Sequence, residues 1–214
     1  SLADYIERMK EGQDKIYYVT ADSLQAAKSS PHLEIFRKKG IKVLLMGERI
    51  DEWLTSHLTE FSEKQFVSIA KANLDLGDLE DEESKKAKEE AEKEVEGLLE
   101  RAKTALGDKV GEVKFTHRLT DSPACIVADD NGMTTQMMKL MQAAGQTVPD
   151  VKYHLELNPE HALVKMLADT QDEALFNEWV GVLFDQAALS EQGSLKDPST
   201  FVQNLNSLLM KLAK

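Results

Sequence analysis

The sequence has a single cysteine, Cys125, so no disulfide can form within the chain. No apolar run approaches the ~18 residues that a membrane-spanning helix needs, and neither an initiator methionine nor a signal peptide opens the chain. The glycines are scattered, without a dinucleotide-binding or Walker-type loop, and no H-E-x-x-H or paired-cysteine zinc motif occurs. These absences predict a fragment or processed product from a reducing cytoplasm, without nucleotide or zinc sites of those kinds.

Basic residues are also scarce, with 26 lysines and arginines against 38 aspartates and glutamates and a net charge of −12. Residues 1–71 hold 11 side chains of each sign, whereas residues 72–108 hold 13 acidic and 6 basic ones. Because nucleic acid and anionic membrane surfaces would be repelled, neither is an expected partner. The stretch 76–108 is rich in Ala, Glu, Lys and Leu, which predicts an acidic helical connector, solvated at first and docked where apolar residues gather at its end.

An alternation of apolar runs and helix signals marks the amino-terminal part. Residues 16–19 are aromatic and β-branched, as in a buried strand. Asp22 or Ser23 can cap a following helix, Gly40 can end the helical stretch, and residues 43–45 form a second buried strand. This strand-helix-strand order predicts an α/β subdomain with a small parallel sheet covered by helices.

The carboxy-terminal part has few strands followed by several helices, which predicts an α+β domain. Alternating apolar residues and turn signals give the strands, and helix-start signals with apolar periodicity give the helices. The predicted strands cover 113–119, 123–127 and 151–157, and the predicted helices cover 159–169, 172–190 and 197–213. The predicted organisation is therefore an α/β subdomain at 1–75, the connector at 76–108 and the α+β domain at 109–214.

Individual residues with reactive side chains give weak signals. His117 lies on the apolar face of its predicted strand, which favours a core histidine over a ligand or base. Cys125 lies in an apolar run, which favours a buried, inert thiol over a nucleophile. Asp129, Asp130 and Asn131 favour a helix cap over a metal loop, since no bidentate glutamate follows at the required spacing.

Two helices offer candidate binding residues. The helix predicted from Gly132 to Gly145 carries one stripe of Met133, Met137, Leu140, Met141 and Ala144, with Met138 beside it. Periodicity alone favours a core-facing stripe, although flexible methionines also suit promiscuous binding surfaces.

A helix from about residue 50 is predicted to bury Ile50, Leu54, Leu58 and Phe61. Trp53 would lie beside that stripe, half exposed, and a boundary core tryptophan is equally compatible.

The last two helices carry more apolar surface than one neighbour can cover. The helix at 172–190 is apolar around most of its circumference, and the final one has a seam with spacings of four, three and four from Phe201 to Leu212. A helical hairpin within the domain is possible, and a two-fold bundle with a second chain is slightly preferred.

Several ordered stretches resemble one family. IYYVT at 16–20, RIDEW at 49–53, HRLTDSPACIV at 117–127 and LELNPEHALV at 155–164 are similar to the ninety-kilodalton heat-shock chaperones, in particular their bacterial members. The resemblance is strong over 1–71 and 109–170. It implies the final α/β subdomain of the chaperone middle segment, then an α+β dimerisation domain that ends in a helical bundle.

The resemblance also implies a function. The fragment would dimerise an ATP-driven chaperone in the cytoplasm and present apolar surface to unfolded or partly folded client proteins. ATP and Mg²⁺ would bind the parent's amino-terminal domain, so neither cofactor nor enzymatic activity is expected in this fragment. The terminal LLMKLAK lacks the acidic peptide that recruits helical-repeat co-chaperones in eukaryotic relatives, so such partners are not implied.

The same resemblance assigns residues to these roles. The implied client-binding residues are Trp53, Met133, Met137, Leu140 and Met141. The implied dimer contacts are Leu175, Trp179, Leu183, Phe201, Leu205, Leu208, Leu209 and Leu212. Two other classes stay open from the residues themselves, which are a stand-alone dimeric adaptor and a small enzyme that uses Cys125 or His117.

Overall fold

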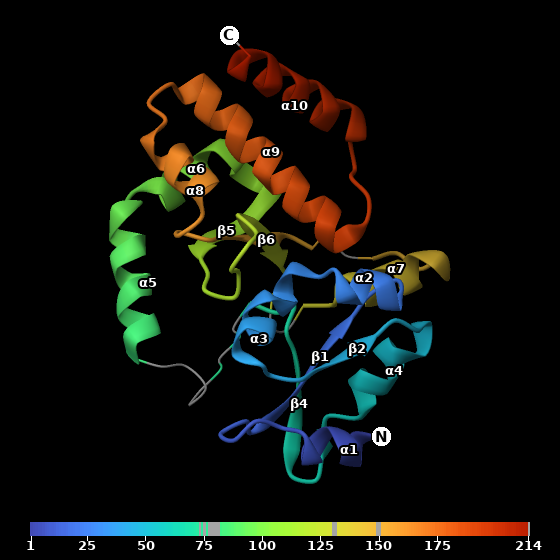
Figure 1. The fold of residues 1–214 in the computed structure, drawn as a ribbon. Helices are drawn as coiled ribbons and strands as arrows, with labels where there is room; N and C mark the ends of the chain where they lie inside the picture. The colour runs from blue at the N-terminus through green and yellow to red at the C-terminus, as the bar shows by residue number, and fades with distance from the viewer. Residues whose placement is uncertain (73, 75, 77–81, 130–131, 149–150, 214) are drawn as a thin grey trace. The chain divides into compact units, whose positions relative to one another are not determined.

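The computed structural model describes residues 1–72, 74, 76, 82–129, 132–148 and 151–213. The chain forms two compact units (Figure 1), of which the first contains residues 1–82 and 128–151 and the second contains residues 83–127 and 152–214. Most of the predicted connector thus belongs to the second unit, and the methionine-rich helix belongs to the first.

The first unit is built on a four-stranded sheet in the order β2-β1-β4-β3. Strand β1 is parallel to β2 and β4, which confirms the predicted parallel pairing, and a β3–β4 hairpin that the sequence analysis missed makes the sheet mixed. Its strands are β1 (Lys15–Thr20), β2 (Val43–Met46), β3 (Glu60–Phe61) and β4 (Lys64–Ser68). Its helices are α1 (Leu2–Glu7), α2 (Leu24–Lys28), η1 (Pro31–Leu33), α3 (Glu34–Lys39), α4 (Arg49–His57) and α7 (Thr135–Ala143).

One face of this sheet forms the core of the first unit. Tyr17 and Val19 of β1 are buried against α2 and α3, and the ring of Phe36 meets that of Tyr17 edge-on at 4.9 Å between centroids. Gly40 ends α3 in the left-handed conformation, as predicted. Tyr5 of α1 is buried, and its hydroxyl donates to the Lys42 carbonyl at 2.7 Å and accepts from the Tyr17 N–H.

The second unit contains a three-stranded mixed sheet in the order β5-β7-β6, with β5 parallel and β6 antiparallel to β7. Helices α6, α8 and α9 contribute buried apolar side chains to one core with this sheet, as expected of an α+β arrangement. The strands are β5 (Val110–Phe115), β6 (Ala124–Val127) and β7 (Tyr153–Leu157). The helices are α5 (Glu82–Glu94), α6 (Leu98–Leu106), η3 (Gly107–Lys109), α8 (Ala162–Asp169), α9 (Glu173–Gln192) and α10 (Pro198–Leu212).

The strand predicted over 113–119 ends early, at Phe115. Arg118 is buried beyond it and pairs with buried Glu156, with Nη2 donating to Oε1 at 3.2 Å and Nε 2.7 Å from Oε2. This pairing breaks the alternation on which the prediction relied. His117 is consequently half-buried rather than in the core, and its Nε2 lies 2.9 Å from Oε1 of Glu92.

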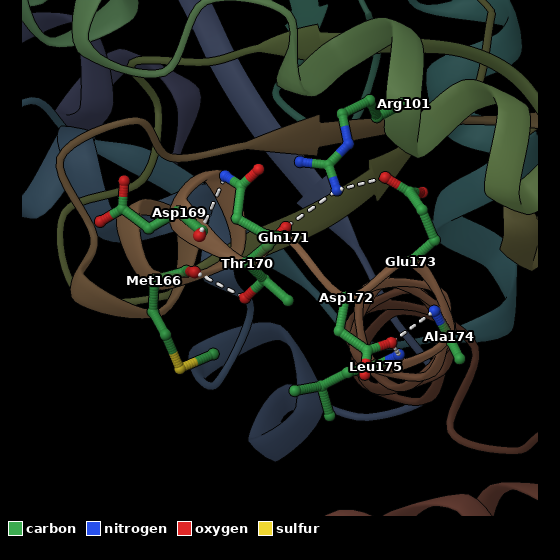
Figure 2. A network of polar contacts seen from close by, with 9 residues as sticks. All are labelled: Arg101, Met166, Asp169, Thr170, Gln171, Asp172, Glu173, Ala174 and Leu175. Atoms are coloured by element: carbon green, nitrogen blue, oxygen red, sulfur yellow. Dashed lines mark hydrogen bonds and ion pairs between the residues drawn. The ribbon is translucent and has the colours of Figure 1, made fainter.

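The predicted docking of the connector's apolar end is confirmed. Leu98, Ala102 and Leu106 of α6 are buried in the core of the second unit. Figure 2 shows Arg101 of the same helix between the Thr170 carbonyl and the Glu173 carboxylate, with Nη2 donating to each at 2.9 Å. One guanidinium group thus ties α6 to the start of α9.

Helix α8 begins at Ala162, three residues later than predicted. His161 is its cap, with Nδ1 accepting from the Leu163 N–H, while Asn158 instead donates through its amide to the Ser122 carbonyl. Among the described helices, none combines the length and apolar character that crossing a membrane requires.

Candidate functional site

Helix α4 presents apolar side chains to solvent. Ile50, Trp53 and Leu54 are 66%, 55% and 44% exposed, and these three residues are called the α4 apolar face. The half exposure predicted for Trp53 is confirmed. The predicted burial of Ile50 and Leu54 is wrong, and the helix ends at His57, so Phe61 lies in β3 instead of on α4.

The physical reason is the carboxylate of Glu52, which points inward from α4 and is only 5% exposed. Its Oε2 accepts the hydroxyl of Thr134 at 2.7 Å. Because Glu52 and half-buried Thr55 occupy the inner side of the helix, the larger apolar side chains face outward. The sequence pattern does not distinguish this orientation from the predicted one, because in both the apolar residues share one side of the helix and the polar residues share the other.

Helix α7 begins later than predicted. Thr134 is its N-cap, with its hydroxyl oxygen accepting from the Met137 N–H at 3.1 Å, so Met133 precedes the helix. The cap is therefore not supplied by the segment from Asp129, of which Asp130 and Asn131 lie outside the described residues. The buried members of α7 are Thr135 and Met138, the methionine expected beside the stripe, whereas Met137, Leu140 and Met141 are half-buried.

Polar contacts hold α7 to the rest of the first unit. Lys139 forms an ion pair with Asp22, and Thr134 donates to Glu52. The Gln136 amide, oriented to satisfy both groups, donates to Asp22 Oδ1 at 2.7 Å and accepts from the Asp22 N–H at 3.2 Å. The sequence analysis identified none of these contacts, because their partners are more than 80 residues apart.

A cavity of about 340 Å³ lies beside these contacts, at the carboxyl ends of β1 and β2. Its polar lining includes Asp22, Glu48, Arg49, Glu52 and Lys139. Its apolar lining comes from Ala21, Leu140 and Ala143.

The residues predicted for a helical dimer contact fall into three groups. Leu183 and Leu208 are buried within the chain itself, so these two are core residues here. Leu209 and Leu212 are 54% and 65% exposed. The half-buried members are Leu175, Trp179, Phe201 and Leu205.

Two further apolar side chains, Val202 and Met210 of α10, are also exposed.

Asp185 of α9 is partly buried, and this burial raises the pKa of its carboxyl group, with nearby Lys109 opposing the shift.

The remaining candidates are Cys125 and groups of metal-ligating side chains. Cys125 is buried, as predicted, and its thiol donates weakly to Glu156 at 3.9 Å. Over the part of the chain that the structure describes, no three His, Cys, Asp or Glu side chains are placed to hold a metal ion together.

The known proteins to which this chain is similar belong to one family and share one name. A family model described as Hsp90 protein matches residues 1–214, so the chain belongs to the Hsp90 family. The chain is 64% identical over its whole length to "Chaperone protein HtpG" of Pseudoalteromonas translucida, and covers 34% of that protein. It is 63% identical to the protein of that name from Colwellia psychrerythraea, again over its whole length, and covers 33% of it. The chain thus spans about a third of the length of these relatives.

Proposed function

We propose that this chain is the last α/β portion of the middle segment and the dimerisation domain of a bacterial Hsp90-family chaperone. Its role is to hold two protomers together and to present apolar surface to unfolded or partly folded proteins in the cytoplasm. The α4 apolar face is the observation that carries this proposal. Large exposed apolar side chains grouped on one helix are typical of protein-interaction sites.

The α4 apolar face is suited to clients of varied sequence. Trp53 offers a large, rigid surface, and burying a side chain of this class contributes about 2–3 kcal/mol. Leu54 and Ile50 extend the surface along the helix, at the spacings that place them on one side. Because apolar burial is not directional, such a surface distinguishes unfolded from folded chains better than it distinguishes sequences.

The second proposed client element is α7. Met137, Leu140 and Met141 are half-buried, which leaves part of each side chain available, and methionine adapts to irregular partners. Met133 precedes the helix and contributes from the adjoining segment. Because α7 and α4 belong to the same compact unit, one client segment can contact both.

The proposed dimer contact is the exposed side of α10. Leu209, Leu212 and Val202 leave apolar surface uncovered on a helix whose Leu208 is buried. A two-fold contact uses the same patch on both chains, so each exposed residue enters the contact once from each chain. Dimerisation would keep two distant ATPase domains of the parent at high effective concentration. We propose that ATP and Mg²⁺ bind those domains and that this fragment has no catalytic activity of its own.

The proposal is tested by titrating the chain into a fluorescently labelled, permanently unfolded polypeptide and measuring anisotropy. Trp53→Arg should weaken binding at least tenfold, because it removes the largest apolar group of the α4 apolar face. Leu189→Arg is the matched control, since Leu189 is also exposed but lies on α9. Equal affinities of both variants and the parent would show that the α4 apolar face does not bind the unfolded polypeptide.

A further inference from the structure

The cavity at the carboxyl ends of β1 and β2 has the position of a ligand site. In parallel sheets, ligands bind in crevices outside the carboxyl ends of the strands. Here Ala21 follows β1, Gly47 follows β2, and α4 and α7 supply the remaining walls. Its volume, about 340 Å³, is at the small end of the ~300–1,000 Å³ typical of ligand pockets. It therefore suits one extended side chain or a ligand of that size.

Glu52 is the least satisfied group in its lining. The residue is 5% exposed, and Oε2 accepts from Thr134. Its Oε1 is buried and has no hydrogen-bond partner among the described residues. A carboxylate oxygen removed from water without a donor is costly, so it favours any ligand that supplies one.

The other charged groups of the lining are engaged elsewhere or lie at its rim. Lys139 is paired with Asp22, and the Glu48 side chain accepts from the Asp51 N–H in the capping box of α4. Arg49 is exposed. With three acidic and two basic side chains in the lining, its net charge is negative, and the buried oxygen without a partner belongs to Glu52.

We propose that this cavity binds an alkylammonium or alkylguanidinium group, with Glu52 as its acceptor. The alkyl stem would lie against Ala21, Leu140 and Ala143, as lysine and arginine stems lie on apolar surface. The cation is either a free small molecule or, if the proposed function holds, a basic side chain of a client segment bound at the α4 apolar face. In the second case the chain prefers apolar segments that carry a lysine or an arginine.

The first arm of the test uses small molecules. Butylguanidinium is titrated into the 214-residue chain and followed by amide chemical shifts, with uncharged butylurea as the control. Saturable shifts at Glu52, Leu140 and Ala143 are expected with butylguanidinium alone, and they should disappear in Glu52→Gln. Ala143→Phe is a second variant that fills the cavity from an exposed position of α7 without altering Glu52. Glu60→Gln, in β3 and outside the lining, should retain the shifts.

The second arm uses two unfolded apolar peptides that differ only in one arginine or its neutral isostere citrulline. A charge-assisted hydrogen bond predicts about tenfold tighter binding of the arginine peptide, and Glu52→Gln should abolish that difference. Shifts with butylguanidinium but no peptide binding would keep the cation site and refute the client proposal. Peptide binding without arginine preference, together with no saturable shifts, would overturn the cation site and leave the client proposal intact.

Discussion

The guanidinium group of Arg101 lies over the ring of Phe176, 3.9 Å from its centroid. The same group donates to the Thr170 carbonyl and to Glu173 (Figure 2). Arg101→Ala should lower the free energy of unfolding by about 1–3 kcal/mol, since it removes a cation–π contact and a charge-assisted hydrogen bond. Glu173 is 70% exposed at its side chain, so Glu173→Ala should cost under about 1 kcal/mol. Urea unfolding measures both losses of free energy, and equal losses would contradict the expectation that Arg101 contributes more than Glu173.

Two glycines should respond to alanine in opposite directions. At Gly47, an added Cβ would lie 2.6 Å from the Ser23 carbonyl carbon and 2.9 Å from Leu24 Cα, so backbone must move. Gly47→Ala should therefore destabilise the first unit by about 1–3 kcal/mol. Gly181 lies inside α9, and an added Cβ there would meet no described atom within 4 Å other than its chain neighbours and the backbone of its own helix, so Gly181→Ala should stabilise the helix by about 0.5–1 kcal/mol. Thermal melting of both variants decides, and a stabilised Gly47→Ala would refute the contact between the β2–α4 turn and α2.

Alkaline pH should destabilise the first unit. Burial raises the pKa of the Tyr5 and Tyr18 phenols above their usual value of about 10. The unfolded chain therefore ionises first, and stability is lost as pH rises through the unfolded and then the folded pKa. Tyr5→Phe should cost about 1–3 kcal/mol at pH 7, since it removes the hydrogen bonds of the Tyr5 hydroxyl with the Lys42 carbonyl and the Tyr17 N–H. Urea unfolding at pH 7, 9 and 10.5 should show a shallower alkaline loss in this variant, and an unchanged slope would count against the buried phenol.

Dimerisation should depend on α10 and not on α4. Leu209→Glu places a carboxylate twice in a two-fold contact and should yield a monomer with nearly unchanged melting, because the side chain is already exposed in the single chain. Leu54→Glu is the matched control on α4 and should remain dimeric while binding clients less tightly. Sedimentation at tens of micromolar distinguishes them. A monomeric parent would refute the proposed contact.

The sequence predicts this structure well where the signal is local. The β1-helix-β2 order and the Gly40 helix end follow from short runs of residues whose conformational preferences agree with the fold. The orientation of α4 could not be predicted, because it depends on the bond between Glu52 and Thr134, 82 residues apart. The early end of β5 also depends on a contact between residues distant in the sequence. Arg118 pairs with Glu156 and so does not follow the predicted alternation. At the candidate site, the family resemblance identifies Trp53 as a candidate client-binding residue. The cavity depends on contacts between distant residues, which no periodic pattern in the sequence predicts.

The central claim, that the α4 apolar face binds unfolded proteins, is tested most directly by the fluorescence of Trp53 itself. The chain has two tryptophans, so Trp179→Phe leaves Trp53 as the only one, and excitation at the long-wavelength edge of tryptophan absorption avoids the tyrosines. An unfolded, tryptophan-free polypeptide is added to saturation, and emission wavelength and acrylamide quenching are measured. Because Trp53 is 55% exposed, contact with a client should shift its emission to the blue and protect it from quenching. Unchanged emission and quenching with the client bound would show that clients bind elsewhere and would contradict the account.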